Sequence, residues 1–422
     1  MFAEWSSRLW QAAVVRSGML TITVLAVVLL ALAIGWREHV KGQFARLKRE
    51  LKRPAAALAP TAPVPGGQEP IVLERSIIEG GSVPEFLSAT LLPGRGMNVF
   101  QIKANLPGKG EVELLASPSI GEATARMAGK GSDADGSVSL SMGGAFEIPW
   151  AGRIYGTPSG PNGLSATWDG KNIHLNAERE NGSAAARGGL LLHMASTSSK
   201  MNVMPDGGEA ETTYQAGDFD DHWPSKLSIV ATTQLSGRVI EMRVVARNTG
   251  DEPEPVGIGW QPRFALLNHS RNGMTLRLPS VTRVETRDQR MGAPTGRLLP
   301  VNGTKYDFSG RTGAPLSNLA LEDTFVHLRQ APLDNGPVVE LRDSANNYGL
   351  RMTILSPSIK ALHVSAPADG NYISISPRFN YDDPFGREWP RDEDTGMAVL
   401  QPGQSAQWKI RMEIFSLSSN GF

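Results

Sequence analysis

Residues 69–422 contain no stretch that keeps helical periodicity of apolar residues over three turns. They show short apolar or alternating runs, which Gly, Pro, Asn and Asp separate. Alternation with a period of two, ended by such turn residues, is typical of β-strands. The runs that predict strands are IVLERSII, NVFQIKAN, SVSLSM, NIHLNAE, GGLLLHM and YISISPRF. The sequence therefore predicts an all-β domain, with helix confined to roughly the first 53 residues.

The clearest local prediction is a hairpin in the segment KLSIVATTQLSGRVIEMRVVARNTG. Leu227, Ile229 and Ala231 alternate along its first strand. Ser236 and Gly237 then turn the chain, and the return strand is expected from Val239 to Arg247. No internal repeat and no second linker interrupt the region, so we expect one large antiparallel sandwich.

Residues 17–36 read SGMLTITVLAVVLLALAIGW and carry no charge. At 1.5 Å per residue, about 20 apolar residues cross a hydrocarbon core of roughly 30 Å. The run is longer than the apolar region of a usual signal peptide, and no small-residue cleavage site precedes the charges that follow. We therefore expect an uncleaved, single-pass transmembrane helix after an N-terminal tail of residues 1–16.

Residues 37–53 form a basic juxtamembrane segment with seven Lys and Arg residues, whereas the N-terminal flank has Arg8 and Arg16. The positive-inside rule favours an inner-membrane protein whose large domain is cytoplasmic. Long domains can be exported against such charges, so a periplasmic location stays open. The segment's apolar residues recur at helical spacing: Val40, Phe44, Leu47 and Leu51. It can lie on anionic lipid headgroups as an amphipathic helix, or it can be a solvated continuation of the helix.

Residues 54–68 are rich in Ala and Pro and predict an extended linker to a domain at residues 69–422. Lys+Arg and Asp+Glu number 42 each, so no excess of basic residues indicates a nucleic-acid partner. The chain has no Cys, which excludes disulfides, thiolate chemistry and Cys-ligated zinc. The acidic run DFDD lacks the spacing of a calcium loop, so we expect no metal and no cofactor.

Six segments follow one another between about residues 87 and 415: PWAGRI, RNTGDEPEPVGIGWQPRF, APTG, NGTKYDF, LEDTF and LQPGQSAQWKIRMEIF. In content and order they resemble the aldose 1-epimerase (galactose mutarotase-like) family. The resemblance implies a large antiparallel β-supersandwich. It also implies a saccharide as ligand.

The activity that this resemblance implies is the interconversion of sugar anomers. A base takes the proton of the anomeric hydroxyl, and an acid supplies one to the ring oxygen. In the family a Glu near the C-terminus is the base and a His is the acid. Here Ser376 stands at the base position and Gln261 at the acid position. Both can hydrogen-bond a sugar, but an amide cannot deliver a proton and an unassisted hydroxyl is no base near neutral pH.

Other residues are candidates for the missing acid and base. Asp383 and Glu388 lie in the loop NYDDPFGREW, and either carboxylate can replace the base if the loop folds inward. His193 and His269 are candidates for the acid. The alternatives are a solvated turn for the carboxylates and structural roles for the histidines.

Further residues are candidates for sugar contacts. Arg153 matches an Arg that contacts sugar hydroxyls in the family, and its alternative is a buried structural role. Glu322 stands at the family's Asp position, with Asp323 as the alternative register. Trp150 and Trp260 can stack on the apolar face of a pyranose or belong to the core.

Three functions are compatible with these patterns. The first is a membrane-anchored carbohydrate-binding protein of the epimerase fold, weakly or non-catalytic because its acid–base pair is replaced. The second is an active, divergent aldose 1-epimerase. The third is a structural subunit of a membrane complex whose groove binds nothing.

Overall fold

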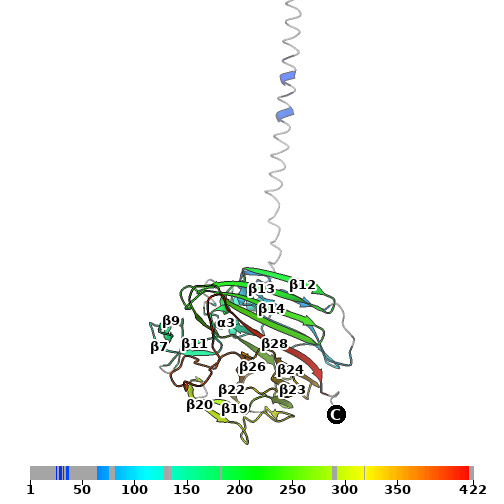
Figure 1. Cartoon of the computed structure of the whole chain (residues 1–422). Coiled ribbons are helices and arrows are strands. Elements are labelled where there is room, and N and C mark those ends of the chain that lie inside the picture. Colours follow the sequence, from blue (N-terminus) through cyan, green and yellow to red (C-terminus); the bar gives the residue numbers. More distant parts are fainter. Residues whose placement is uncertain are drawn as a thin grey trace, which may run out of the picture. The chain divides into compact units, whose positions relative to one another are not determined.

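The computed structural model describes residues 64–75, 81–127, 133, 135–180, 183–287, 292–317 and 319–417, together with residues 25, 28–30, 32 and 35–37. The chain divides into two units, residues 1–62 and 63–422. The second unit holds all the described strands. Its architecture is a mostly antiparallel β-sandwich (Figure 1).

The larger sheet has eleven strands within the described residues, and its neighbours are antiparallel. Its spatial order is β1 (Ile71–Glu74), β2 (Glu85–Leu92), β3 (Asn98–Leu106), β5 (Gly144–Glu147), β17 (Gly259–Ala265), β26 (Tyr372–Arg378), β25 (Ala361–Ala366), β22 (Leu321–Val326), β19 (Thr282–Thr286) and β20 (Pro294–Pro300), with β4 (Gly110–Glu113) beside β3. Among its central strands, β25 and β26 are consecutive in sequence, whereas β17 and β22 come from more distant parts of the chain.

The second sheet has nine strands within the described residues. Its order is β12 (Ser198–Met204), β13 (Gly207–Gly217), β14 (Leu227–Ser236), β15 (Val239–Asn248), β28 (Ser405–Ser416), β24 (Tyr348–Ile354), β23 (Val338–Asp343), β18 (Met274–Arg277) and β21 (Ala314–Pro315). On β15 and β28 buried residues alternate with more exposed ones, because one face of the sheet covers the core.

The core lies between the two large sheets. Trp408 of β28 meets Phe146 of β5 edge to face, with ring centroids 5.6 Å apart. The indole nitrogen of Trp408 also donates to the carbonyl of Pro377 on β26, at 3.1 Å. These contacts join the sheets near the middle of the larger one, where the candidate site described below is built.

Shorter elements complete the domain. The small sheets contain β6 (Arg153–Tyr155), β7 (Thr157–Pro158), β8 (Gly163–Trp168), β9 (Lys171–Asn176), β10 (Glu178–Glu180), β11 (Ser183–Arg187), β16 (Glu254–Val256) and β27 (Ala398–Leu400). The helical elements are α2 (Ile120–Arg126) and α3 (Ser137–Leu140) and the 3-10 turns η1 (Pro65–Gly67), η2 (Pro93–Arg95) and η3 (Leu191–His193).

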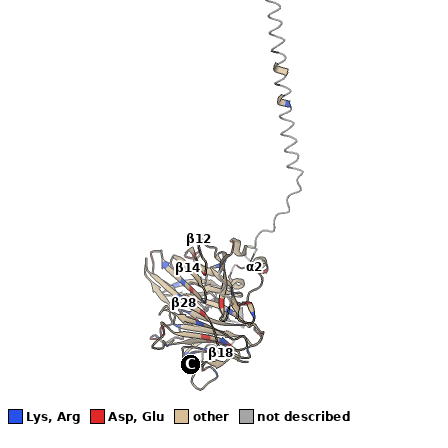
Figure 2. Cartoon of the chain, turned by 90° about the vertical axis from the view of Figure 1, so that its right-hand side faces the viewer, with Lys and Arg blue, Asp and Glu red and all other residues tan. Residues whose placement is uncertain are grey.

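Charged residues of both signs are interspersed along the strands of the domain (Figure 2). Several pair across neighbouring strands, such as Lys409 with Glu241 at 2.9 Å and Lys103 with Glu111 at 2.8 Å. Such partly exposed pairs contribute little to stability, typically up to about 1 kcal/mol each.

The predicted hairpin is confirmed as β14 and β15. Ser236 pairs with Val239, and Gly237 adopts a φ of 58°, which a tight hairpin turn requires. Four of the predicted strand runs also contain strands, namely β1, β3, β9 and β26.

Two strand predictions are wrong, and so is the expectation that helix ends near residue 53. The run SVSLSM contains helix α3 at Ser137–Leu140, where the carboxylate of Asp133 accepts the otherwise unpaired amide of Val138 in the first turn at 2.8 Å. The run GGLLLHM forms the 3-10 turn η3, after Gly188 and Gly189 adopt φ values of 74° and 82° that end β11. Helix α2 also lies beyond residue 53.

The structure describes only a few residues of the transmembrane helix predicted at residues 17–36. None of the helices in the described parts of the chain has the length and apolar character needed to cross a membrane. The rest of the predicted span, nearly all of the basic segment and most of the linker lie outside the described residues.

We expect a chain shortened to residues 63–422 to fold as the full chain does, because the sandwich core is made entirely within this unit. Far-UV circular dichroism should show mainly β-structure, and thermal unfolding should show one transition at an unchanged midpoint. An unfolded product, or two independent transitions, would contradict the single-domain assignment.

Candidate functional site

A cavity of about 210 Å³ lies against the centre of the larger sheet. Side chains of adjacent strands alternate between the core and this cavity, because successive residues of a strand point to opposite faces. On β17, for example, Trp260 is buried in the core and Gln261 lines the cavity. The lining residues are Leu140, Glu147, Gly152, Arg153, Arg187, Gln261, Arg263, Glu322, His363, Ser365, Pro367, Tyr372 and Arg378.

Arg153 and Glu322 form an ion pair at the cavity wall. Arg153 of β6 is buried, and its Nη2 donates to Oε1 of Glu322 on β22 at 2.8 Å. Burial works against the charged guanidinium, but Asp382 and Glu322 outweigh it and raise the pKa of Arg153. The sequence predicted both residues as sugar contacts, and the structure brings them together across 169 residues of chain.

Glu322 stays ionised near neutral pH. Burial alone would raise the pKa of its carboxyl, but His363 and Arg153 hold that pKa well below its usual range. A carboxylate with so low a pKa is a good hydrogen-bond acceptor and a poor base.

His363 lies between two carboxylates and was missed by the sequence analysis. Its Nε2 is 3.5 Å from Oε1 of Glu322, and its Nδ1 is 3.0 Å from the Thr324 hydroxyl and 4.0 Å from Oδ2 of Asp382. The signal that could have found it is the alternation of β25, ALHVSA. Leu362 faces the core, whereas His363 lines the cavity.

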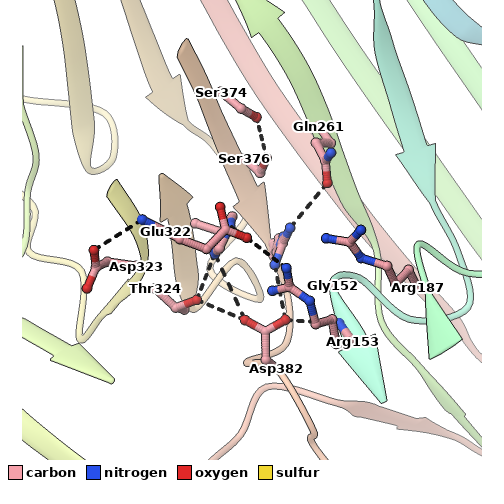
Figure 3. A network of polar contacts seen from close by, with 12 residues as sticks. Gly152, Arg153, Arg187, Gln261, Glu322, Asp323, Thr324, Ser374, Ser376 and Asp382 are labelled. Carbon is pink, nitrogen blue, oxygen red and sulfur yellow. Dashed lines mark hydrogen bonds and ion pairs between the residues drawn. The ribbon is translucent and has the colours of Figure 1, made fainter. Parts of the chain in front are cut away.

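Asp382 organises the base of the cavity from a fully buried position (Figure 3). It accepts the backbone amide of Arg153 at 2.9 Å and the hydroxyl of Thr324 at 3.0 Å. It also lies 3.5 Å from Nη1 of Arg378. Burial would raise the pKa of Asp382, but the charges of Arg378, His363 and Arg153 hold it below its usual range.

Arg378 connects this network to the predicted acid position. Its Nε is 3.4 Å from Oε2 of Glu147, and its Nη2 donates to Oε1 of Gln261 at 3.4 Å. The Gln261 oxygen is thereby engaged, which leaves the amide NH₂ as the donor that can meet a ligand in the cavity.

Gly152 lets the backbone pass close to the network. It has a φ of 74°, and a Cβ atom there would lie 2.3 Å from Oδ1 of Asp382. Its amide donates to Oε1 of Glu147 at 3.1 Å. Any side chain at this position would displace the buried carboxylate.

Three predicted site residues on strands of the larger sheet do not line the cavity. Ser376 is fully buried, with its hydroxyl 3.2 Å from that of Ser374. Trp260 is a core residue whose indole donates to the Gly144 carbonyl at 3.0 Å. Asp323 pairs with Arg283 at 3.1 Å, because it points to the opposite face of β22 from Glu322.

Asp383 and Glu388 also lie outside this cavity. Asp383 is buried, and its carboxylate accepts the backbone amide of Tyr155 at 3.0 Å. Burial raises the pKa of Asp383 to about 8, and the neighbouring carboxylate of Glu388 adds to the effect. The hydrogen bond of Asp383 to the Tyr155 amide holds the loop NYDDPFGREW in place.

His193 and Trp150 line a larger neighbouring cavity of about 640 Å³, which shares Leu140 and Arg187 with the first. Burial lowers the pKa of His193. Trp150 is almost fully buried and stacks on Trp223, with centroids 5.5 Å apart. His269 is exposed and lines neither of these two cavities.

The cavity offers donors and an acceptor in a small space. Arg153 and Gln261 donate, Glu322 accepts, and His363 contributes an imidazole whose two ring nitrogens can donate or accept. Among the residues that the structure describes, no three His, Asp or Glu side chains are grouped so as to hold a metal ion. The arrangement is suited to recognising several hydroxyl groups at once.

The comparisons with known proteins agree with this architecture. The family model described as aldose 1-epimerase matches residues 131–413. A galactose mutarotase-like protein of Clostridium acetobutylicum superposes with a TM-score of 0.63 at 15% identity, covering 82% of this chain and 98% of its own. No curated protein sequence matches the chain significantly.

Two further solved structures share the fold. A GalM/aldose epimerase homologue from C. elegans has a TM-score of 0.58 at 17% identity, covering 82% of this chain and 98% of its own. A putative aldose 1-epimerase from Escherichia coli K12 has a TM-score of 0.57 at 15% identity, covering 83% of this chain and 100% of its own.

Proposed function

Since the chain belongs to the aldose 1-epimerase family, we propose that its 210 Å³ cavity binds a saccharide and that it catalyses anomer interconversion weakly or not at all. The observation that carries the proposal is the Arg153–Glu322 pair, which lines the cavity together with Gln261. A sugar hydroxyl both donates and accepts hydrogen bonds. A donor and an ionised acceptor 2.8 Å apart can therefore hold two hydroxyls of one ring.

Weak catalysis follows from the groups at the acid and base positions. Ser376 is buried beside Ser374 and does not line the cavity. Gln261 can only hydrogen-bond a ring oxygen. Losing a general acid or a general base typically costs about 10² to 10⁴-fold in rate.

A second candidate function is active mutarotation with His363 as the proton carrier. The observation that favours it is the position of His363 in the cavity wall, with Nε2 3.5 Å from Oε1 of Glu322. In this reaction the imidazole takes the anomeric proton. As the bond between the anomeric carbon and the ring oxygen breaks, the imidazolium, which Glu322 stabilises, returns this proton to the ring oxygen, and the Gln261 amide holds that oxygen by a hydrogen bond.

Sugar binding and polarimetry with the full chain in detergent test the proposal. We expect glucose or galactose to bind, and Arg153→Ala to weaken binding about 10- to 100-fold, because a charge-assisted hydrogen bond is lost. Arg243→Ala is the matched control, since Arg243 is exposed on β15 of the other sheet.

The rate of mutarotation separates the candidates. Our proposal expects little or no acceleration over buffer. A robust rate that His363→Gln abolishes would establish the second candidate instead. Neither a rate nor binding to any sugar tested would refute saccharide binding and favour a structural subunit of a membrane complex.

We also propose that residues 17–36 anchor the chain in the cell inner membrane, with residues 37–53 on anionic headgroups and the large domain in the cytoplasm. The uncharged apolar run and the basic residues after it support this arrangement. The full chain should resist alkaline extraction from membranes. A reporter fused after the C-terminus should be active in the cytoplasm, and periplasmic activity would reverse the orientation.

A further inference from the structure

Arg263 is a charged cavity residue that lacks a charged partner in the described part of the chain. It lies two residues after Gln261 on β17 and lines the same cavity. Its guanidinium carbon lies over the Tyr372 ring, 4.5 Å from the centroid, and its buried Nε has no hydrogen-bond partner among the described residues. Tyr372 orients the guanidinium but does not form an ion pair with it.

Arg187 is the second cation at this end of the cavity. It ends β11, where its backbone pairs with that of Arg153. Its ion pair with Glu178 is long, at 3.4 Å, and lies at the surface, where such pairs are weak. Figure 3 shows its guanidinium directed toward the space that Gln261 and Arg153 border.

The other two arginines of the cavity are already neutralised. Arg153 pairs with Glu322 at 2.8 Å, and Arg378 lies 3.4 Å from Glu147 and 3.5 Å from Asp382. Of the four arginines that line the cavity, Arg187 and Arg263 are therefore the two without a close buried carboxylate among the described residues. Burial lowers the pKa of Arg263 and the nearby charge of Arg187 adds to that effect, while Tyr372 and Glu322 act against it without reversing it. A bound anion would offset both the cost of burying the Arg263 charge and its repulsion by Arg187.

We propose that the saccharide bound in this cavity carries an anionic group, a carboxylate or a phosphate, and that Arg187 and Arg263 bind it. This inference rests on the proposed function. Both anions match the planar fork of a guanidinium, which can donate two parallel hydrogen bonds. Residues two apart on a strand are about 7 Å apart. One sugar can therefore meet Gln261 with its ring and Arg263 with its charged substituent.

Calorimetric titration of the full chain in detergent with glucose, glucuronate and glucose 6-phosphate tests the inference. We expect at least one anionic sugar to bind about 10- to 100-fold more tightly than glucose. Arg263→Gln and Arg187→Gln should each reduce this preference about tenfold or more. Arg243→Gln should preserve it, since that exposed arginine lies on the other sheet. Arg187 is partly exposed, so its variant serves if Arg263→Gln fails to fold.

The two anionic sugars in the titration distinguish a carboxylate from a phosphate. Preference for glucuronate alone identifies a carboxylate, and preference for glucose 6-phosphate alone identifies a phosphate. Glucose binding as tightly as both anionic sugars would overturn the inference and leave saccharide binding intact. A preference that survives both substitutions would overturn the assignment to these arginines. If no sugar binds, both the inference and the proposed function fail.

Discussion

Replacing Asp382 with Asn is expected to lower the free energy of unfolding by about 3 to 5 kcal/mol, which is the typical cost of removing one charge of a buried ion pair. The Asp382 carboxylate is buried 3.5 Å from Arg378 and accepts the Arg153 amide and the Thr324 hydroxyl. An amide keeps the shape but removes the charge, so Arg378 loses one of its two buried counter-charges. Urea unfolding at pH 7 measures the change.

The adjacent Asp383→Asn is a matched control. Burial raises the pKa of Asp383 to about 8, so its carboxyl is mostly protonated at pH 7 and already resembles an amide. Its φ of 51° is one that Asn tolerates well. We expect a change below about 1 kcal/mol, as for most substitutions that break no special contact. Equal losses in the two variants would contradict the role given to Asp382.

Replacing Glu254 with Gln is expected to stabilise the protein at alkaline pH. Glu254 of β16 is fully buried, and neither carboxylate oxygen has a hydrogen-bond partner among the described residues. Burial raises its pKa from 4.5 to about 8. The folded state thus keeps a proton that the unfolded state releases at lower pH. Stability therefore falls as pH rises from about 4.5 to about 8.

The size of the effect follows from the pKa shift, at about 1.4 kcal/mol per pKa unit, which gives an upper limit of about 5 kcal/mol above pH 8. The pKa of Asp383 is raised too, so Asp383 also makes the free energy of unfolding fall with pH in this range. The difference in free energy of unfolding between wild type and Glu254→Gln therefore isolates the contribution of Glu254. Urea unfolding at pH 5 and pH 9 measures it. Asp251→Asn, exposed just before β16, is the control. An equal pH dependence in wild type and Glu254→Gln would show that Glu254 is not buried as a neutral acid.

Three cavity residues were predictable because they belong to short motifs. Arg153 lies in PWAGRI, Gln261 in GWQPRF and Glu322 in LEDTF, and all three line the cavity. The motif LEDTF left the register open between Glu322 and Asp323, and the sheet settles it because these neighbours on β22 point to opposite faces.

The candidates offered to replace the acid and base were chosen by chemical type and nearness in sequence, and such criteria carry no information about direction. His193 and His269 lie elsewhere, and the loop of Asp383 folds so that its carboxylate holds the Tyr155 amide. His363 was missed because it joins the cavity only through pairing of β25 with β22 and β26.

The sequence by itself determined the all-β class, the large hairpin and the family, because strand alternation, turn residues and motif order are local properties. Only the tertiary structure decided that Ser137–Leu140 in SVSLSM is helical, since Asn98, 41 residues away in the chain, donates to the Ser139 carbonyl. It also decided the composition of the cavity. Arg153 reaches Glu322 across 169 residues and binds Asp382 across 229. Contacts at such separation arise from sheet pairing and core packing, which depend on the whole chain at once.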